Sequence, residues 1–145
     1  MRIKDVLSAK PSREVITVSP DASVRDLVGL LAEHNVGALI VSGDGSSVDG
    51  IVSERDVVRQ LHADESVLDA AVSAIMTIEV QSCSGSDAVN DLMQMMTEFR
   101  IRHVPVVKNG AITGIISIGD VVKSRMSELE FERDQLDSYV HTAQS

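Results

Sequence analysis

The chain repeats itself once, in three blocks that keep the same order. Residues 50–59, GIVSERDVVR, recur 64 positions later as residues 114–123, GIISIGDVVK. Two upstream blocks, VRDL from residue 24 and VGALIV from residue 36, each have a counterpart 65 positions later. Self-similarity at a nearly fixed spacing is typical of a duplicated structural unit. The 145 residues are therefore expected to fold into two similar substructures, with one loop shorter by a residue.

Each unit reads as strand, helix, strand, strand, helix. In the first copy an extended run at residues 15–18 precedes an amphipathic helix over residues 23–34. The apolar runs 38–41 and 50–53 are joined by a glycine-rich loop, which predicts a hairpin, and a second helix begins near Glu54. The same order returns in the second copy. The sequence thus predicts an α+β fold built from two β-α-β-β-α units.

The repeat also sets the expected domain boundaries. We expect a first unit over residues 1–64, a second over residues 65–124 and a helical extension over residues 125–145. The joining segment 65–78 carries apolar residues at helical spacing and is predicted to contain a helix.

The end of the chain is predicted to form an amphipathic helix over about residues 121–141. Its apolar residues follow one another at intervals of 4, 3, 7 and 4 positions, a spacing close to a heptad pattern. Such a helix buries one face, either against its own domain or in a dimer contact, and the pattern alone leaves both open. The stripe consists of Val122, Met126, Leu129, Leu136 and Val140.

Charge and composition exclude several classes of function. With 13 basic and 22 acidic residues the net charge is −9, which disfavours nucleic acids and anionic membranes but leaves room for a small phosphate ligand. The single cysteine, Cys83, suits a reducing compartment and is expected to be a buried, inert thiol. With no apolar leader and no long apolar run, the protein is expected to be cytoplasmic. No metal-ligand spacing, phosphate loop or catalytic triad is recognisable, so neither a metal site nor a catalytic residue is predicted.

The doubled unit, with Gly-Ile-[Val/Ile]-Ser-x-x-Asp opening the last helix of each copy, resembles the CBS domain, named after cystathionine β-synthase. The resemblance extends over residues 3–122 and is closest to small proteins made of one CBS pair. It implies that the two copies pack by their sheets about a pseudo-twofold axis and leave two clefts. It further implies a homodimer, no enzymatic activity, and an adenosine ligand such as AMP, ADP, ATP, NAD or S-adenosylmethionine.

The resemblance assigns the central ligand contacts to the repeated Ser-x-x-Asp motif. Asp56 and Asp120 match the ribose-binding aspartate, and Ser53 and Ser117 match its hydroxyl partner. A carboxylate suits this task, because it can accept hydrogen bonds from two adjacent ribose hydroxyls. The alternative is that the serines and aspartates only cap helices, since both residue types favour helix starts.

Further contacts are implied at the strands. Thr17 and its counterpart Ser82 match positions that offer a hydroxyl to the ligand, although a strand threonine also suits a sheet in any case. Arg102 and His103 match positions that approach phosphates, and a guanidinium is well shaped for that. The alternative for this pair is a solvated basic corner.

The two clefts are expected to differ. The first copy has Gly37 and Ala38 where the second has the basic pair, and it instead carries Arg55 next to its aspartate. Which cleft holds a polyphosphate stays open, because each cleft borrows residues from both copies. The adenine face is expected to be lined, through apolar contacts and backbone amides, by Ala38, Leu39, Val104 and Pro105.

Two functions remain. The first is a regulatory module that binds AMP, ADP, ATP or NAD, senses energy or redox state, and signals to a partner protein in trans. The second is a protein-interaction scaffold without nucleotide affinity. In the first, the terminal helix is the expected contact surface; the acidic charge and the methionine-rich helix with Met93, Met95 and Met96 are compatible with the second.

Overall fold

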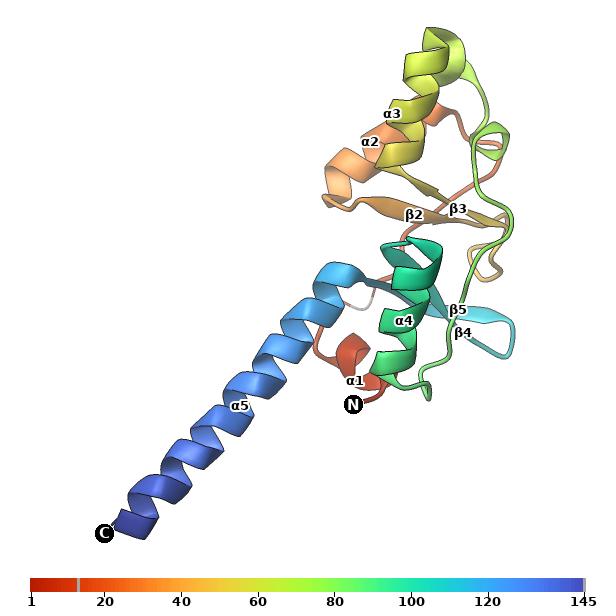
Figure 1. Ribbon diagram of the computed structural model, residues 1–145. Helices are drawn as coiled ribbons and strands as arrows, with labels where there is room; N and C mark the ends of the chain where they lie inside the picture. The colour runs from red at the N-terminus through yellow and green to blue at the C-terminus, as the bar shows by residue number, and fades with distance from the viewer. Residues whose placement is uncertain (13, 145) are drawn as a thin grey trace.

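The computed structural model describes residues 1–12 and 14–144, with side chains described as far as residue 142. It confirms the mixed α+β fold with two units and a C-terminal helix (Figure 1). The first unit contains β1 (Thr17–Val18), α2 (Val24–His34), β2 (Ala38–Val41), β3 (Gly50–Ser53) and α3 (Glu54–Ala63). The second contains α4 (Val89–Phe99), β4 (His103–Lys108), β5 (Ala111–Ser117) and the first turns of α5 (Ile118–Gln144).

The duplication is visible in the strand pairing. In the first unit β1 pairs parallel with β2, where Val18 lies opposite Val41, and β2 pairs antiparallel with β3. In the second unit β4 and β5 form the same antiparallel hairpin. The predicted first strand is reduced there to one parallel bridge between Cys83 and Val106, which are the counterparts of Val18 and Val41 at an offset of 65.

Helix ends follow the repeat as well. The Ser23 side chain accepts a hydrogen bond from the Asp26 N–H, which confirms Ser23 as the cap of α2. The helices α2 and α4 end at Asn35 and Arg100, whose φ angles are 52° and 54°. A left-handed residue is a common way to stop a helix, and it is unusual for arginine. Arg100 is thereby placed at the turn that leads into β4.

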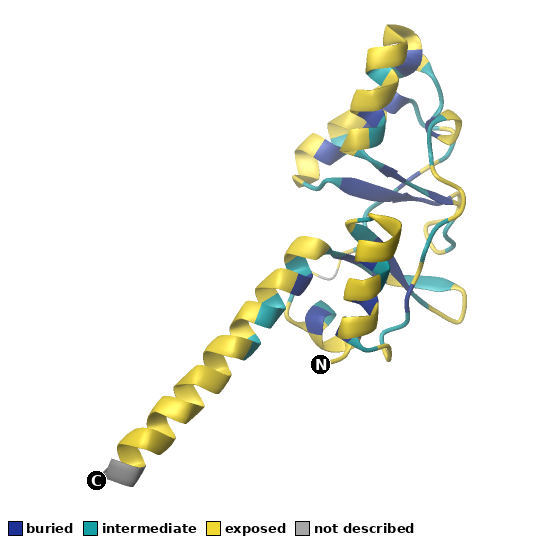
Figure 2. Ribbon diagram, in the orientation of Figure 1, coloured by how far each residue is buried: buried dark blue, intermediate teal, exposed yellow. Residues whose placement is uncertain are grey.

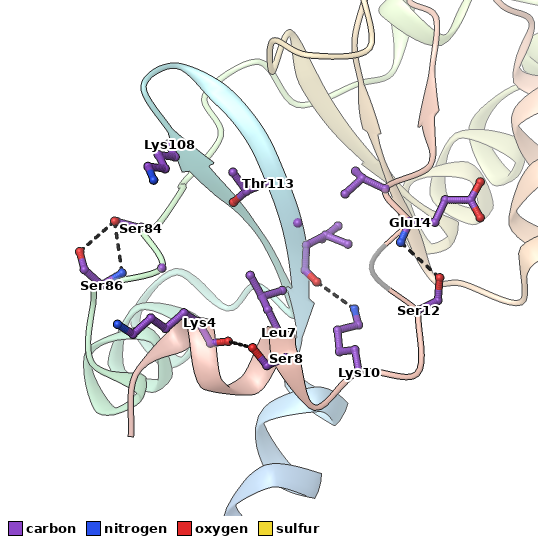
Figure 3. A pocket seen from close by; sticks show the side chains of 14 residues that line it. Lys4, Leu7, Ser8, Lys10, Ser12, Glu14, Ser84, Ser86, Lys108 and Thr113 are labelled. Carbon is purple, nitrogen blue, oxygen red and sulfur yellow. Dashed lines mark hydrogen bonds between the residues drawn. The ribbon is translucent and has the colours of Figure 1, made fainter.

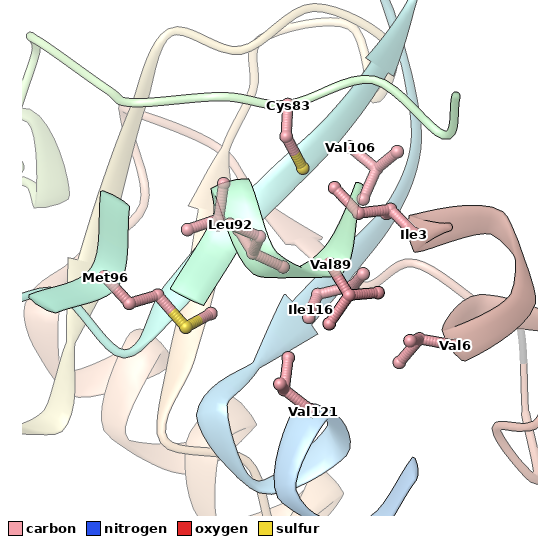
Figure 4. Packing of buried hydrophobic residues seen from close by; sticks show 10 residues of the cluster. Ile3, Val6, Cys83, Val89, Leu92, Met96, Val106, Ile116 and Val121 are labelled. Carbon is pink, nitrogen blue, oxygen red and sulfur yellow. The ribbon is translucent and has the colours of Figure 1, made fainter. Parts of the chain in front are cut away.

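Each unit has its own apolar core. The segment that precedes each unit in the sequence packs into the core of the other unit. The short helix α1 (Ile3–Ser8) contributes Ile3 and Val6 to the core of the second unit (Figure 4). The first core instead takes Val67 and Val72 from the linking segment. The helix expected within residues 65–78 takes the form of two short 3₁₀ helices, η1 (Glu65–Asp69) and η2 (Val72–Ala74), and not of an α-helix. Packing therefore crosses the boundary expected at residue 64.

The cores are aliphatic, as the composition requires. Phe99, Phe131 and Tyr139 are all exposed. Cys83 is buried, and burial, with a smaller effect of the Asp87 charge, raises the pKa of its thiol to about 12. This confirms the expectation of an inert thiol, since the reactive form is the thiolate.

The helix α5 leaves the folded body after its first turns (Figures 1 and 2). Val121 is buried, and Ser124, Arg125 and Glu128 are half-buried beside α1 and α4. All residues from 129 to 142 are exposed. Of the two possibilities for its apolar stripe, packing against its own domain is thus not what the structure shows. Over the described residues, no helix combines the length and apolar character needed to cross a membrane.

Candidate functional site

The two Ser-x-x-Asp motifs form helix caps with matching geometry. Asp56 Oδ2 accepts hydrogen bonds from the Ser53 N–H at 2.8 Å and from Ser53 Oγ at 3.0 Å, and the Asp56 N–H donates back to Ser53 Oγ at 3.2 Å. Asp120 Oδ2 accepts from the Ser117 N–H at 2.9 Å, and the Asp120 N–H donates to Ser117 Oγ at 3.1 Å. The capping alternative is therefore realised in both copies.

The helix cap uses only one of the two oxygens of the Asp56 carboxylate. In the described part of the chain, Oδ1 of Asp56 has no hydrogen bond and no ion pair, while Oδ2 makes the cap. Asp56 is half-buried and lines a cavity of about 300 Å³. This volume lies at the lower end of the range for small-molecule sites. A carboxylate oxygen that faces a cavity can accept hydrogen bonds from a ligand without loss of the cap.

The cavity is formed by both units. The first unit contributes the ends of β2 and β3 and the first turns of α3, and the second contributes the approach to β4. The segment 77–81, which leads from one unit to the next, supplies another wall. The lining consists of Gly37, Ala38, Ile51, Ser53, Glu54, Arg55, Asp56, Arg59, Thr77, Glu79, Val80, Gln81, Arg100, Ile101, Arg102 and His103.

Four arginines meet at this cavity. Arg55 and Arg59 lie on α3, and Arg100 and Arg102 lie just before β4. Three carboxylates, those of Glu54, Asp56 and Glu79, line the same cavity, so its charged residues sum to about +1 in a chain with a net charge of −9. Because guanidinium groups bind phosphate oxygens through paired N–H groups, this cavity is suited to a phosphorylated ligand. The two copies were expected to place different basic residues at different clefts. The structure instead places the arginines of both copies at this one cavity.

His103 adds a donor to the cavity but no charge near neutral pH. Burial lowers the pKa of His103 below its usual value of 6.5, with smaller opposing effects of the nearby Asp120 and Glu54 charges. A Cβ added at Gly37 would lie 3.3 Å from His103 Cε1, which is closer than most real contacts. Gly37 therefore leaves room for the imidazole. The positive charge expected from the pair Arg102 and His103 comes from the arginine.

The second aspartate is held by a lysine from the N-terminal segment. Lys10 Nζ lies 3.0 Å from Asp120 Oδ2. It also donates to the Ile115 carbonyl at 2.9 Å, a hydrogen bond drawn in Figure 3. Burial raises the pKa of Asp120, but the Ser117 and Lys10 hydrogen bonds and the Lys10 charge outweigh it and hold the pKa below its usual value. In the first cleft no described cation pairs with Asp56, and Ile75, which follows Lys10 by 65 positions, packs against the first core instead of lining the cavity. The two clefts are therefore chemically unequal.

A second cavity of about 430 Å³ lies beside Lys10 (Figure 3). Its wall includes Ser12, Glu14 and Val15, which are the counterparts of Thr77, Glu79 and Val80 at an offset of 65. The cavity thus borders the second cleft and extends along α1. Neither Ser117 nor Asp120 is part of its wall, whereas Lys10, the partner of Asp120, is.

The structure brings together seven of the residues predicted from sequence. Other predicted residues lie elsewhere: Val104 is fully buried in the second core, and Pro105 is buried with its carbonyl bonded to the Cys83 N–H. Neither of these two residues lines the first cavity, so their contact with an adenine ring stays a prediction. Thr17 pairs within the first sheet, and neither it nor the exposed Ser82 lines either cavity. The seven that share the first cavity are Gly37, Ala38, Ser53, Arg55, Asp56, Arg102 and His103.

Sequence reasoning missed the wall formed by residues 77–81 and the lysine at position 10. The sequence does contain a signal for this wall. Residues 12–16 and 77–81 are 65 positions apart and lead into the first strand of each copy. The Lys10–Asp120 pair joins positions 110 apart, and no local pattern marks it.

Comparison with known proteins agrees with this architecture. The family model of the CBS domain matches residues 3–71 and 72–127. The CBS domain-containing protein CBSX3, mitochondrial, of Arabidopsis thaliana is 35% identical over 146 residues, which cover 95% of this chain and 71% of the plant protein. A CBS-domain containing protein from Agrobacterium tumefaciens, whose crystal structure is known, is 44% identical with a TM-score of 0.81, over 86% of this chain and 99% of that one.

A more distant structure shares the fold. The CBS domain pair of protein MJ0100, solved in complex with 5′-methylthioadenosine and S-adenosyl-L-methionine, is 23% identical with a TM-score of 0.76. The match covers 85% of this chain and 98% of that one. Two matched domains, the duplicated sheets and these relatives lead to one conclusion: the chain belongs to the CBS domain family and carries two CBS domains in tandem.

Proposed function

We propose that this CBS pair binds an adenosine-containing ligand, of the series AMP, ADP, ATP and NAD, in the cleft at Asp56. The observation that carries the proposal is the cavity in which the Asp56 carboxylate and four arginines meet. A carboxylate for ribose and guanidinium groups for phosphate are the two polar requirements of a nucleotide. The fold itself supports this choice, because the MJ0100 CBS pair was solved with two adenosine derivatives.

Each side of the cleft has a distinct task in the proposal. Asp56 Oδ1 accepts hydrogen bonds from the ribose hydroxyls while Oδ2 keeps the helix cap. Arg55, Arg59, Arg100 and Arg102 surround the phosphates. The adenine ring contacts the apolar wall that includes Ile51 and Val80.

The second cleft is proposed to stay empty in the resting protein. The Lys10 ammonium pairs with the aspartate that would otherwise receive a ribose. A ligand there must first break an ion pair and a hydrogen bond to the Ile115 carbonyl. The expected stoichiometry is one ligand per chain.

The proposed biological role rests on ligand binding and not on catalysis. We propose a regulatory module that responds to energy or redox state, forms a homodimer, and signals to an effector protein in trans in the cytoplasm. Ligand binding can drive such signalling only if the ligand has different affinities for two states of the module. The cleft lies between the two units, so occupancy can favour one arrangement of the units over another.

Calorimetry on nucleotide-free protein tests this proposal. A thermal-shift panel of AMP, ADP, ATP, NAD and S-adenosylmethionine first selects the ligand, since a ligand at 100 times its Kd adds about 2.7 kcal/mol of stability. Asp56→Asn should then weaken the selected ligand about 10- to 100-fold, because hydrogen bonds to a charged group contribute about 1.5–3 kcal/mol. Ser53 remains the N-cap of α3, and the amide oxygen of an asparagine at position 56 can still accept from the Ser53 N–H, so the fold is kept.

Asp120→Asn is the matched control and should leave the affinity within a factor of about three, since single contacts outside a site have small effects. Equal loss in both variants would contradict the assignment to the Asp56 cleft. A flat panel would contradict ligand binding and favour the scaffold function.

A further inference from the structure

The outer part of α5 carries an apolar stripe that nothing in the described structure covers (Figures 1 and 2). Contiguous exposed apolar surface on a protein of this size is typical of an interaction site. The stripe side chains are between 47% and 65% exposed: Val122, Met126, Leu129, Leu136 and Val140.

The stripe has the geometry of a helix–helix seam. Its spacing of 4, 3, 7 and 4 places the residues at alternating d and a positions of consecutive heptads, with Arg133 at the one polar a position. Successive residues of a helix are separated by about 100°, so the stripe lies about a quarter turn from Val121, which faces the folded body. A second helix can therefore lie along the stripe while α5 keeps its contacts with α1 and α4.

Charge along α5 is separated by sign. Near the body the helix carries Lys123 and Arg125, and beyond them acidic residues predominate, with Arg133 as the single cation between residues 128 and 140. A helix with one basic end and one acidic end complements a copy of itself that runs in the opposite direction. The acidic residues are Glu128, Glu130, Glu132, Asp134 and Asp137.

We propose that α5 pairs antiparallel with α5 of a second copy of this chain. With the two helices aligned about residue 131, Val122 lies across from Val140 and Met126 from Leu136 of the second copy. Lys123 then faces Asp137 of the second copy, once at each end of the pair. The inference deepens the homodimer proposed above and is independent of ligand binding.

Arg133 decides the direction of the pair. In a parallel pair the two a positions face each other, so Arg133 would lie against Arg133 in the seam. In the antiparallel pair Arg133 lies across from Leu129, near Glu130 and Glu132 of the second copy. Like charges face each other in the first arrangement and opposite charges in the second.

The oligomeric state tests the interface. Sedimentation equilibrium of the native chain over a concentration series should approach twice the 15.6 kDa mass of the chain. The double variant Leu129→Glu and Leu136→Glu should sediment as a monomer with unchanged helix content. Phe131→Glu is the matched control, because Phe131 is 62% exposed on the same helix but lies outside the stripe, and it should remain dimeric.

A native chain that sediments only as a monomer would overturn both the dimer and this interface. A dimer that survives the double leucine variant would keep the dimer and overturn the helix pairing. Neither outcome bears on the Asp56 cleft, which calorimetry tests separately.

Disulfide trapping tests the direction. Under mild oxidation Val140→Cys alone should stay uncrosslinked, whereas an equimolar mixture of Val122→Cys and Val140→Cys chains should form a covalent mixed dimer. The native Cys83 does not interfere, because it is buried with a pKa of about 12. Crosslinking of Val140→Cys with itself would indicate a parallel pair and overturn the proposed direction.

Discussion

At the residue scale, the difference between the clefts depends on Lys10. The lysine reaches Asp120 and the Ile115 carbonyl, whereas no cation among the described residues pairs with Asp56. The aspartates themselves cap their helices in nearly the same way. Both copies therefore keep the same capping geometry, and the Lys10 side chain makes the Asp120 carboxylate less available to a ligand than that of Asp56.

Lys10→Met should open the second cleft. Methionine keeps much of the length of the lysine side chain but forms no ion pair, so Asp120 becomes available to a ribose. Calorimetry with the selected nucleotide should then give two ligands per chain instead of one. Lys4→Met, which changes a lysine of the same cavity that does not hold Asp120, is the control and should leave one. A stoichiometry that stays at one in Lys10→Met would refute the blocking role.

His103 should make stability depend on pH. Because burial lowers its pKa below 6.5, the folded protein favours the neutral imidazole more than the unfolded chain does. This contribution is complete above pH 6.5 and is lost as the pH falls from 6.5 toward the folded pKa. The free energy of unfolding, measured with urea between about pH 5 and 6.5, should fall less steeply with falling pH in His103→Gln than in the native protein.

His62→Gln is the control, because His62 is exposed at the end of α3 and lies outside the cleft. An unchanged slope in His103→Gln would show that burial does not hold this imidazole neutral.

At the element scale, two glycines in regular structure should respond oppositely to alanine. A Cβ at Gly50 of β3 would lie 2.9 Å from the Thr77 carbonyl oxygen and 2.8 Å from Met76 Sδ, so Gly50→Ala should destabilise the fold by about 1–3 kcal/mol. A Cβ at Gly29 in α2 would meet nothing within 4 Å. Gly29→Ala should therefore stabilise by about 0.5–1 kcal/mol. Chemical unfolding measures both free-energy changes, and changes of the same sign would contradict the close approach of Met76 and Thr77 to β3.

The repeated elements could be predicted because they depend on local patterns. The hairpin of β2 and β3, the Ser23 cap and the starts of α2 and α3 fall where the sequence predicts them. Apolar alternation, cap residues and a glycine-rich turn act over a few positions, and two copies of the same pattern support each other.

The linking segment could not be predicted, because long-range pairing decides its conformation. Ala71 pairs with Ser23 in an extended bridge, and this interrupts the helix that Val72, Ile75 and Met76 suggest. Arg2 makes the equivalent bridge to Ala88 and directs α1 into the second core. Apolar spacing shows that a segment is buried, but it does not show which core receives it.

Half of the candidate site was predictable for a similar reason. The Ser53 and Asp56 motif is local and repeated, and the basic residues are visible in the sequence. The convergence of Arg55 with Arg102 depends on how the two units pack, and the Lys10–Asp120 pair spans most of the chain.

At the scale of the whole molecule, two groups of cations carry the proposals for this acidic chain. Four arginines line the Asp56 cleft, and Lys123 with Arg125 lies at the base of α5. If the proposals hold, the first group binds phosphate and the second complements the acidic end of another copy. Raised salt should therefore weaken both ligand binding and dimerisation, because each depends on unlike charges near solvent. A dimer that strengthens with salt would instead depend on the apolar seam alone.

The most direct test of the central proposal locates the ligand in the native protein. Amide ¹H–¹⁵N spectra of labelled chain should be recorded during titration with the selected nucleotide. We expect the largest amide chemical-shift changes at the first cleft, at Gly37, Ser53, Asp56, Thr77 and Arg102. The amide signals of Lys10 and Asp120 should change little. Shifts that centre on Lys10 and Asp120, or no shifts at all, would contradict the proposal.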